Sequence, residues 1–581
     1  MSSANASATS KQADDRDFGV LDRNSLSSED LRLENNPSKA SFIDQDHSNS
    51  RPQETAQMSS MFVAKCIVKG ETEKALPTTF EVCKEHDIDT TNVTFCYSAD
   101  DISNSPHNSY EDLKAPLEGG YGWVCCVCVT LIMFSTWGAN SAFGVFLAYF
   151  FNNGVFLHAT KFDYALIAGM TVAFGQGLAP LAMVLTRILG CKMPMYAGIV
   201  VLFLGFFLAS FATKLWHLYV TQGVLVGISI ALLYAPATTI IPGWFFKKRS
   251  LAIGVSLMGT GAGGVTYSLA VNKLIGETGH HYWALRMMAI VCSITLVVSV
   301  TLLKERNPST PTGLSSLSKV RQQFEIVYSL QVSKMPNVLL LAVWFAFALF
   351  AYNLMIFTLS PYGVAKGLNS KQASLLTTSL NASQCLGRPV MGFLGDRIGK
   401  LNVTVILTTC LTVFMFAFWL NCHSFLQLLF FSICVGSCVG VANVMSTVLV
   451  ADMVNVDYFL PAWSLVNAAG APFLLVCEVV AQALVVERPT QNPYLHTQVF
   501  AGLCFSAALL LIMLLREFKV RKVLQEGLKT TEFEIEDCLK GARGDRNLEL
   551  KNFVEEQELL GNLLTRGAKG FLRRMFYPVK V

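Results

Sequence analysis

Twelve long apolar runs follow one another between residues 116 and 515, and they restrict the possible folds of this chain more than any other feature. These 400 residues of a 581-residue protein hold only 10 acidic and 20 basic side chains, too few for a water-soluble surface. Each run approaches the ~20 residues that a helix needs to cross a ~30 Å hydrocarbon core. Helix is required there, because unpaired backbone groups in lipid cost several kcal/mol each. We expect spans at about 122–151, 163–187, 193–213, 216–241, 251–273, 283–303, 338–361, 371–394, 402–420, 424–449, 462–486 and 497–515.

The composition changes at both ends of this apolar region. Residues 1–115 are rich in Ser, Asn and Asp, carry 20 acidic and 11 basic side chains, and begin without an apolar stretch. Residues 516–581 carry 11 acidic and 14 basic side chains. Both segments are predicted to be disordered cytosolic tails, with no cleaved signal peptide. For the end of the second tail, where leucines alternate with basic residues, an amphipathic helix on an anionic membrane face is an equal alternative.

The spacing of the runs indicates two bundles. Eleven connections are short or moderate, whereas residues 304–337 form one long, basic connection between a six-span bundle at 116–303 and another at 338–515. This is the layout of a two-bundle secondary transporter. With both tails in the cytosol, sixteen Lys and Arg fall inside and seven outside, so the chain is predicted to be N-in and C-in. The plasma membrane is the expected location, with a vacuolar or other organelle membrane as the alternative.

Several classes of function are excluded by what the sequence lacks. The few charges are spread along short loops, which argues against nucleic acid as a partner. Most of the 16 cysteines lie inside apolar runs, where they behave as small hydrophobic side chains, so neither a zinc site nor structural disulfides are predicted. The chain also shows no buried nucleophile, acid pair or metal-ligand set. We therefore predict no enzyme activity, no cofactor and no metal.

The eighth run carries a polar stripe. Thr377, Asn381, Gln384 and Arg388 are spaced four, three and four residues apart, hence on one helical face. An arginine near mid-membrane costs about 2.5–3.5 kcal/mol on insertion scales, so it needs a polar cavity or a partner. The alternative is that Arg388 snorkels to the interface. Other candidate cavity residues, each of which could equally serve helix packing, are Asn140, Ser141 and Asn443.

Two motifs carry a resemblance to a known family. The first is Glu118-Gly119-Gly120-Tyr121-Gly122-Trp123, just before the first span, and the second runs from Trp244 to Gly263 into the fifth span. Together they resemble the two signatures of the monocarboxylate transporter family, over residues 116–515, and imply the all-α major-facilitator fold with twelve helices in two six-helix bundles. The matching positions of the second signature include Lys247, Lys248, Arg249, Gly254, Gly259 and Gly263. Its glycines would let span five pack closely on a neighbour and slide.

The resemblance also assigns roles around Arg388. It implies that Arg388 binds the substrate anion, and that Asp396 and Arg397, in a loop motif typical of major facilitators, belong to the cytosolic gate. Proton-coupled animal relatives have an Asp and a Lys at the positions of Gln384 and Ser141. Because a Gln side chain cannot take up and release a proton near neutral pH, the resemblance points to a fungal-type branch.

One acidic residue lies deep within a span. Glu478 is a candidate for proton coupling, and a structural hydrogen bond between helices is an equal alternative. The predicted function is secondary-active or facilitative transport of small organic anions, specifically monocarboxylates, by alternating access in the lipid bilayer. The alternatives are facilitated transport of riboflavin or a similar nutrient, and a transceptor that senses such a substrate.

Overall fold

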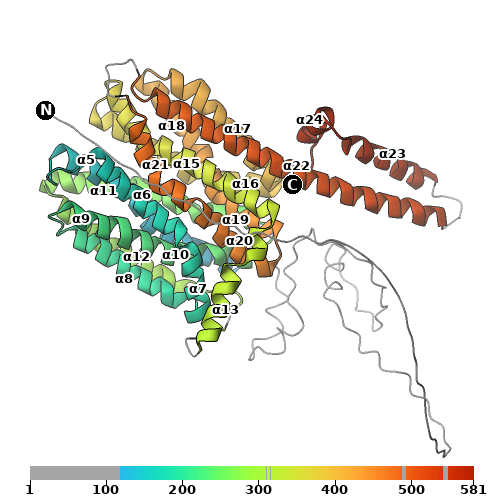
Figure 1. The fold of residues 1–581 in the computed structure, drawn as a ribbon, viewed down its shortest axis with the longest axis horizontal. Coiled ribbons are helices and arrows are strands. Elements are labelled where there is room, and N and C mark those ends of the chain that lie inside the picture. Colours follow the sequence, from blue (N-terminus) through green and yellow to red (C-terminus); the bar gives the residue numbers. More distant parts are fainter. Residues whose placement is uncertain (1–117, 309, 314–315, 487–491, 541–546) are drawn as a thin grey trace, which may run out of the picture. The chain divides into compact units, whose positions relative to one another are not determined.

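The computed structural model describes residues 118–308, 310–313, 316–486, 492–540 and 547–581 (Figure 1). The expected N-terminal tail, residues 1–115, lies outside this part of the chain. All regular structure in the described part is helical, apart from a single bridge between Glu118 and Phe245. The first half of the chain contributes α3 (Tyr121–Met133), η1 (Phe134–Gly138), α4 (Ala139–Ser141), α5 (Phe143–Asn152), α6 (Lys161–Gly177), α7 (Ala179–Leu189), α8 (Lys192–Ala209), α9 (Leu215–Leu218), η2 (Tyr219–Leu225), α10 (Val226–Trp244), α11 (Arg249–Thr278) and α12 (His281–Leu302).

Two short helices, α13 (Leu317–Val327) and α14 (Leu330–Ser333), lie in the long connection. The second half then repeats the pattern of membrane-length helices. Its helices are α15 (Pro336–Ala365), α16 (Ser370–Ile398), α17 (Lys400–Val413), η3 (Phe414–Phe418), η4 (Trp419–Asn421), α18 (Phe425–Val439), α19 (Val441–Met453), α20 (Val456–Ala469), α21 (Ala471–Ala483), α22 (Leu495–Lys540), α23 (Asn547–Leu563) and α24 (Ala568–Phe576).

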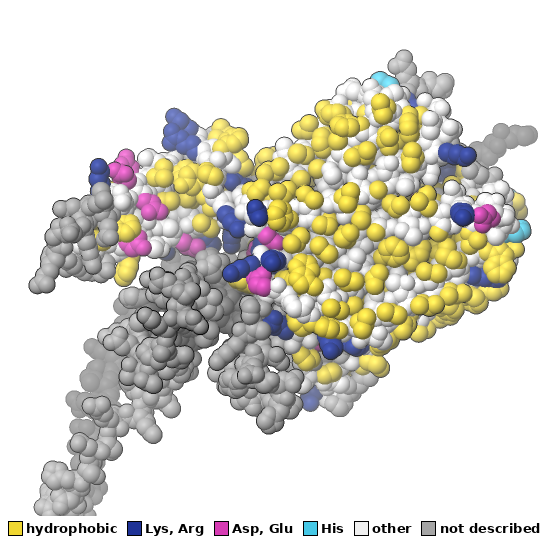
Figure 2. Space-filling model, turned by 180° about the vertical axis from the view of Figure 1, so that it is seen from behind, with side chains coloured by type: hydrophobic (Ala, Val, Ile, Leu, Met, Phe, Trp, Pro, Cys, Tyr) yellow, Lys and Arg dark blue, Asp and Glu magenta, His cyan; other side chains and the backbone are white. Residues whose placement is uncertain are grey.

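Length and hydropathy single out most of the spans. In the described part, nine helices are long and apolar enough to cross a membrane, or ten if the bent pair α6–α7 counts as one span. Of the twelve expected spans, α11 and α16 do not meet this criterion. They have 30 and 29 residues and would also reach across the membrane, at about 1.5 Å per residue. Glycines in α11 and polar side chains in α16 lower the mean hydropathy of these two helices. Across the middle of the bundle, the surface is mainly hydrophobic and uncharged (Figure 2).

The glycines of α11 explain why this helix can be so weakly apolar. It makes its most extensive contact with α16, from the other half of the chain. A Cβ atom at Gly254 or Gly261 would overlap a carbonyl oxygen of α16, and one at Gly259 or Gly263 would overlap a carbonyl oxygen of α3 or η1. Only glycine allows such a close approach on both faces. The part of α11 from Arg249 to Gly264 is therefore largely buried between its neighbours.

One end of the bundle gathers the basic loops. Trp244 donates a hydrogen bond to the carbonyl oxygen of Lys304, and Arg249 pairs with Asp452, so the loops after α10, α12 and α19 lie together. We call this the basic end, defined by the loops that hold Lys247, Lys248, Arg249, Lys304, Arg306, Arg397 and Lys400.

The C-terminal segment differs from the expected disordered tail. Helix α22 continues without a break from its apolar part to Lys540, and α23 packs back on it through a small core of Val520, Leu524, Leu560 and Leu563. The expectation of disorder was wrong for residues 516–540 and 547–563, because the many charges of this segment conceal an apolar stripe, whereas α24 agrees with the alternative of a helix at the end of the tail. Two helices that face each other can bury such a stripe, although neither could bury it alone.

Candidate substrate site and gate

Arg388 is the centre of the candidate site. Its side chain is 2% exposed and lies between α16 and α11, where Nη1 donates a hydrogen bond of 2.6 Å to the carbonyl oxygen of Leu257. Nη2 donates to Oε1 of Gln384 at 2.8 Å, one turn earlier on α16. The buried Nε atom has no hydrogen-bond partner among the described residues. Of the five N–H groups of a guanidinium, the structure therefore engages two within the protein.

No carboxylate in the described part of the chain balances the charge of Arg388. Among the described residues, no Asp or Glu forms an ion pair with Arg388, and the titratable side chains beside it are Tyr352, Cys385 and Tyr234. An uncompensated charge in a low-dielectric interior is costly.

Aromatic side chains surround the Arg388 region. Tyr352 of α15 lies within hydrogen-bonding distance of the Gln384 amide, at 3.4–3.5 Å, and the Tyr234 hydroxyl donates to Oδ1 of Asn467 at 3.2 Å. The ring of Tyr234 packs against Trp137 and Trp463, with centroid distances of 5.9 and 5.6 Å. Four helical segments of both halves, η1, α10, α15 and α20, thus supply aromatic side chains near the charge.

Only some of the other predicted cavity residues lie in this region of the bundle. Asn381 and Ser141 both approach Gly264 of α11, so these two side chains lie at one place in the bundle. The hydroxyl of Ser141 donates to the carbonyl oxygen of Trp137, at 3.1 Å. Asn140 and Asn443 are half-buried, and the structure gives no side-chain hydrogen bond from either to the Arg388 region.

At the basic end, carboxylates of the second half meet the beginning of α11. Asp396 accepts hydrogen bonds from the backbone N–H groups of Ser250 and Leu251, at 3.1 and 2.9 Å. Free N–H groups and the helix dipole make a helix N-terminus favourable for a negative charge. Asp452 joins Arg249 at 3.3 Å and Lys400 at 2.5 Å. These contacts hold the two halves together at this end.

The remaining gate candidates take no part in those contacts. Arg397 is exposed and its guanidinium stacks on the ring of Phe393, with 4.7 Å to the centroid. The side chains of Lys247 and Lys248 are exposed. Hydrogen bonds from Arg249, Ser250 and Leu251 to second-half carboxylates, together with those of Tyr234 and Arg388, join the two halves from the basic end to the level of Leu257.

The two family signatures pack on each other. The Glu118 carboxylate accepts a hydrogen bond from the backbone N–H of Lys247 at 2.8 Å, and Trp123 makes an edge-to-face contact with Phe245 at 4.9 Å. A Cβ at Gly122 would stand 2.9 Å from Cβ of Trp244, so this position needs glycine. Segments separated by more than 100 residues thus form one unit at the basic end. Gly119, Gly120 and Tyr121 complete the first signature in this unit, with the Tyr121 ring beside that of Trp244.

Glu478 lies apart from the Arg388 region, on α21 where this helix packs against α6 of the other half. Its side chain is buried, and Oε2 has no hydrogen-bond partner among the described residues. The break between α20 and α21 at Gly470 lies between it and Asn467.

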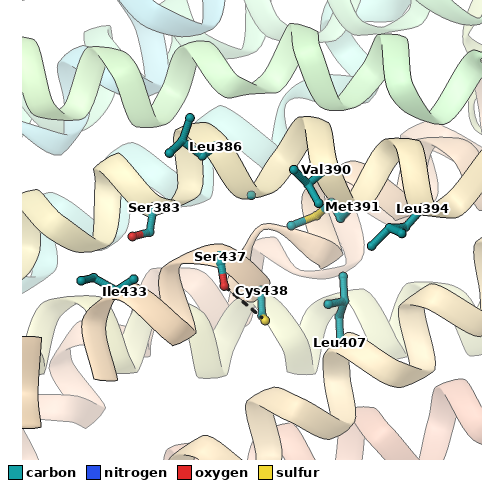
Figure 3. A pocket seen from close by; sticks show the side chains of 10 residues that line it. Ser383, Leu386, Val390, Met391, Leu394, Leu407, Ile433, Ser437 and Cys438 are labelled. Carbon is teal, nitrogen blue, oxygen red and sulfur yellow. Dashed lines mark hydrogen bonds between the residues drawn. The ribbon is translucent and has the colours of Figure 1, made fainter. Parts of the chain in front are cut away.

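A groove of about 330 Å³ on the outer surface of α16, α17 and α18 has a different character (Figure 3). Leu386, Val390 and Ile433 line it and are 73%, 56% and 46% exposed. These are the apolar side chains that a membrane helix turns toward lipid, so we do not assign the groove to the substrate. The other lining residues are Ser383, Gly387, Met391, Leu394, Leu407, Ser437 and Cys438.

Sequence reasoning missed several residues near the site and the gate. Tyr234, Tyr352 and Trp463 lie inside apolar runs, where an aromatic side chain gives no separate signal. Asp452 follows the tenth run by three residues and looks like an ordinary loop acid. A clue existed only for Asp452, since it is one of just ten acidic residues between 116 and 515.

Comparison with known proteins places this geometry in a family. The model of the Major Facilitator Superfamily matches residues 125–456 and 355–567. The chain is 54% identical to the uncharacterized transporter ESBP6 of Saccharomyces cerevisiae, over 82% of this chain and 71% of that protein. It is 30% identical to the probable transporter MCH2 of the same yeast, over 76% and 90%.

A more distant relative is the MFS transporter asaE of Aspergillus flavus, 24% identical over 67% of this chain and 85% of that protein. Among solved structures, the proton:xylose symporter XylE resembles the fold with a TM-score of 0.50 and 13% identity, over 67% of this chain and 94% of that one. The expected fold class is confirmed by this likeness. The chain therefore belongs to the major facilitator superfamily and is a multi-pass membrane transporter.

Proposed function

We propose that this transporter carries small organic anions, and monocarboxylates in particular, by alternating access. The observation that carries the proposal is the buried guanidinium of Arg388, which no carboxylate of the described residues neutralises. A carboxylate is the complementary ligand, because it can accept two parallel hydrogen bonds from one guanidinium. Its binding would also relieve the cost of the buried charge.

The position of Arg388 supports a role in the transport cycle. It lies on α16 in the second half and is hydrogen-bonded to Leu257 of α11 in the first half. A substrate that competes for this guanidinium would weaken one contact between the halves. Midplane sites between two bundles are typical of secondary transporters.

The contacts at the basic end support alternating access. We propose that Asp396, Arg249 and Asp452 form the gate of that end, and that this end faces the cytosol. The hydrogen bonds of Asp396 and the ion pair of Asp452 would have to break when the halves rock. Arg397 and the basic residues beside Arg249 would remain on the cytosolic surface, as the positive-inside rule expects. The plasma membrane is the proposed location.

Glu478 is the proposed site for a coupling proton. It is buried on α21, a helix that packs against α6 of the other half, so its charge state would affect how the halves separate. Gln384 cannot take this role, because an amide does not titrate near neutral pH.

A second candidate substrate is a planar aromatic nutrient such as riboflavin. The rings of Trp137, Tyr234 and Trp463 near Arg388 favour it, since aromatic side chains stack on a flat ring system. Uptake into vesicles that contain the purified protein separates these possibilities. Labelled lactate, pyruvate and acetate would be compared with labelled riboflavin, each with and without a pH gradient. Uptake of none of them by a protein that binds one tightly would indicate a transceptor.

A further inference from the structure

A buried charge network fixes the orientation of α24. Arg574 is fully buried, and its Nε donates to the Glu517 carboxylate at 2.8 Å. Arg516 in turn donates to the carbonyl oxygens of Arg574 and Tyr577, at 3.0 and 3.3 Å. These bonds attach α24 to α22 and determine which of its faces remains outside.

The outer face of α24 combines basic and apolar residues. Lys569, Leu572, Arg573 and Phe576 are exposed and spaced three, one and three residues apart, so they form one stripe on the helix. Phe576 is 84% exposed and Leu572 55%. The described residues provide no cover for these two side chains. Basic side chains beside exposed Phe and Leu are typical of helices that lie in a membrane interface.

The network also sets the level of α24 relative to the bilayer. Arg516 is the first charged residue after the apolar run 497–515, so it marks the point where α22 leaves the hydrocarbon core. Because Arg516 bonds the C-terminal end of α24, this helix lies beside the membrane surface. The neighbouring α23 is different, since it exposes Glu555, Glu556 and Glu558. Charge complementarity therefore selects α24, and not α23, for an anionic surface.

We propose that the stripe Lys569–Leu572–Arg573–Phe576 binds the anionic lipid headgroups of the leaflet at the basic end. Phe576 and Leu572 would enter the interface while Lys569 and Arg573 meet lipid phosphates and carboxylates. Because Arg574 attaches α24 to α22, the stripe is already ordered before it meets lipid. Binding therefore costs little conformational entropy. This inference concerns the lipid partner and is independent of the transported substrate.

Hydrogen exchange of the full chain in nanodiscs tests the proposal. Amides of residues 568–576 are expected to exchange more slowly in phosphatidylcholine with phosphatidylserine than in phosphatidylcholine alone, and added salt should remove the difference. Replacing both basic residues, Lys569→Gln with Arg573→Gln, should lower the ratio of bound to free helix about 25-fold, because each charge near an anionic surface contributes roughly a factor of five.

Two further variants complete the test. Leu572→Ser with Phe576→Ser should reduce protection in both kinds of nanodisc, since it removes the apolar contribution. The matched control, Lys529→Gln with Lys551→Gln, removes the same charge from α22 and α23 and should leave residues 568–576 unchanged. Equal exchange of the wild-type helix in the two lipids would overturn the proposal. So would protection that arises only when cytosolic protein is added, because the stripe would then be a protein-binding surface.

Discussion

Replacement of Arg388 by lysine tests the proposed anion site most directly. The guanidinium uses two N–H groups for Leu257 and Gln384, which leaves three, including Nε–H, for a bound carboxylate. An ammonium has three N–H groups at a single point and cannot present two parallel donors. Arg388→Lys should therefore keep the charge but lose the bidentate geometry.

The expected change in KM follows from the hydrogen bonds to the substrate that Arg388→Lys loses. One charge-assisted hydrogen bond contributes about 1.5–3 kcal/mol. Its loss should raise KM about 10- to 150-fold, since each 1.4 kcal/mol is a factor of ten in affinity. Arg388→Gln removes the charge as well and leaves a bound carboxylate unpaired, so uptake should fall below detection.

The assay is uptake of labelled monocarboxylate against substrate concentration, normalised to the amount of protein in the membrane. Arg397→Lys is the matched control, because it makes the same change on the same helix at an exposed position away from the site. It should leave KM near the wild-type value.

An unchanged concentration dependence and maximum rate for Arg388→Lys would refute the reasoning. Lysine snorkels as well as arginine, so a silent substitution is the behaviour of an interfacial anchor. The charge would then have no part in substrate binding.

Four further predictions concern coupling, gate, packing and tail. An imposed pH gradient should change uptake only weakly, and Glu478→Gln should abolish the remaining response; a strong response that survives this substitution would place the proton elsewhere. Asp396→Asn weakens the charge interaction at the N-terminus of α11, worth about 0.3–1 kcal/mol, and should change the maximum rate more than KM in the same uptake assay. Gly261→Ala places a Cβ 2.5 Å from a carbonyl oxygen and should reduce uptake, whereas Gly276→Ala, with open space around it, should not. Deletion of residues 1–110 should leave uptake per surface molecule near normal, and a surface-localised truncation without uptake would contradict this.

The membrane-spanning character of the chain could be predicted from sequence because it depends on local composition. Long apolar runs must form helices in lipid, whatever their neighbours are. The polar stripe that ends at Arg388 was also visible, since its spacing lies within one helix. The same local reasoning failed for residues 516–540 and 547–563, where the stabilising contacts join α22 to α23 and α24.

The partners of each site residue required the tertiary structure. Sequence singled out Arg388, but the bond to Leu257 and the nearby Tyr234 come from helices more than 100 residues away. Asp452 forms an ion pair with Arg249 only because α19 ends beside the beginning of α11. Oε2 of Glu478 likewise is buried without a hydrogen-bond partner among the described residues, on a helix that packs against α6.

The sequence by itself determined that this protein crosses the membrane many times, with its spans in two groups. Those properties follow from the hydrophobic effect and from backbone hydrogen bonding, which act on each segment separately. Only the tertiary structure decided which charges are buried, which are neutralised and which face of α24 is exposed. The electrostatic free energy of a charged group depends on every neighbour within a few ångströms, and in this chain those neighbours come from distant helices.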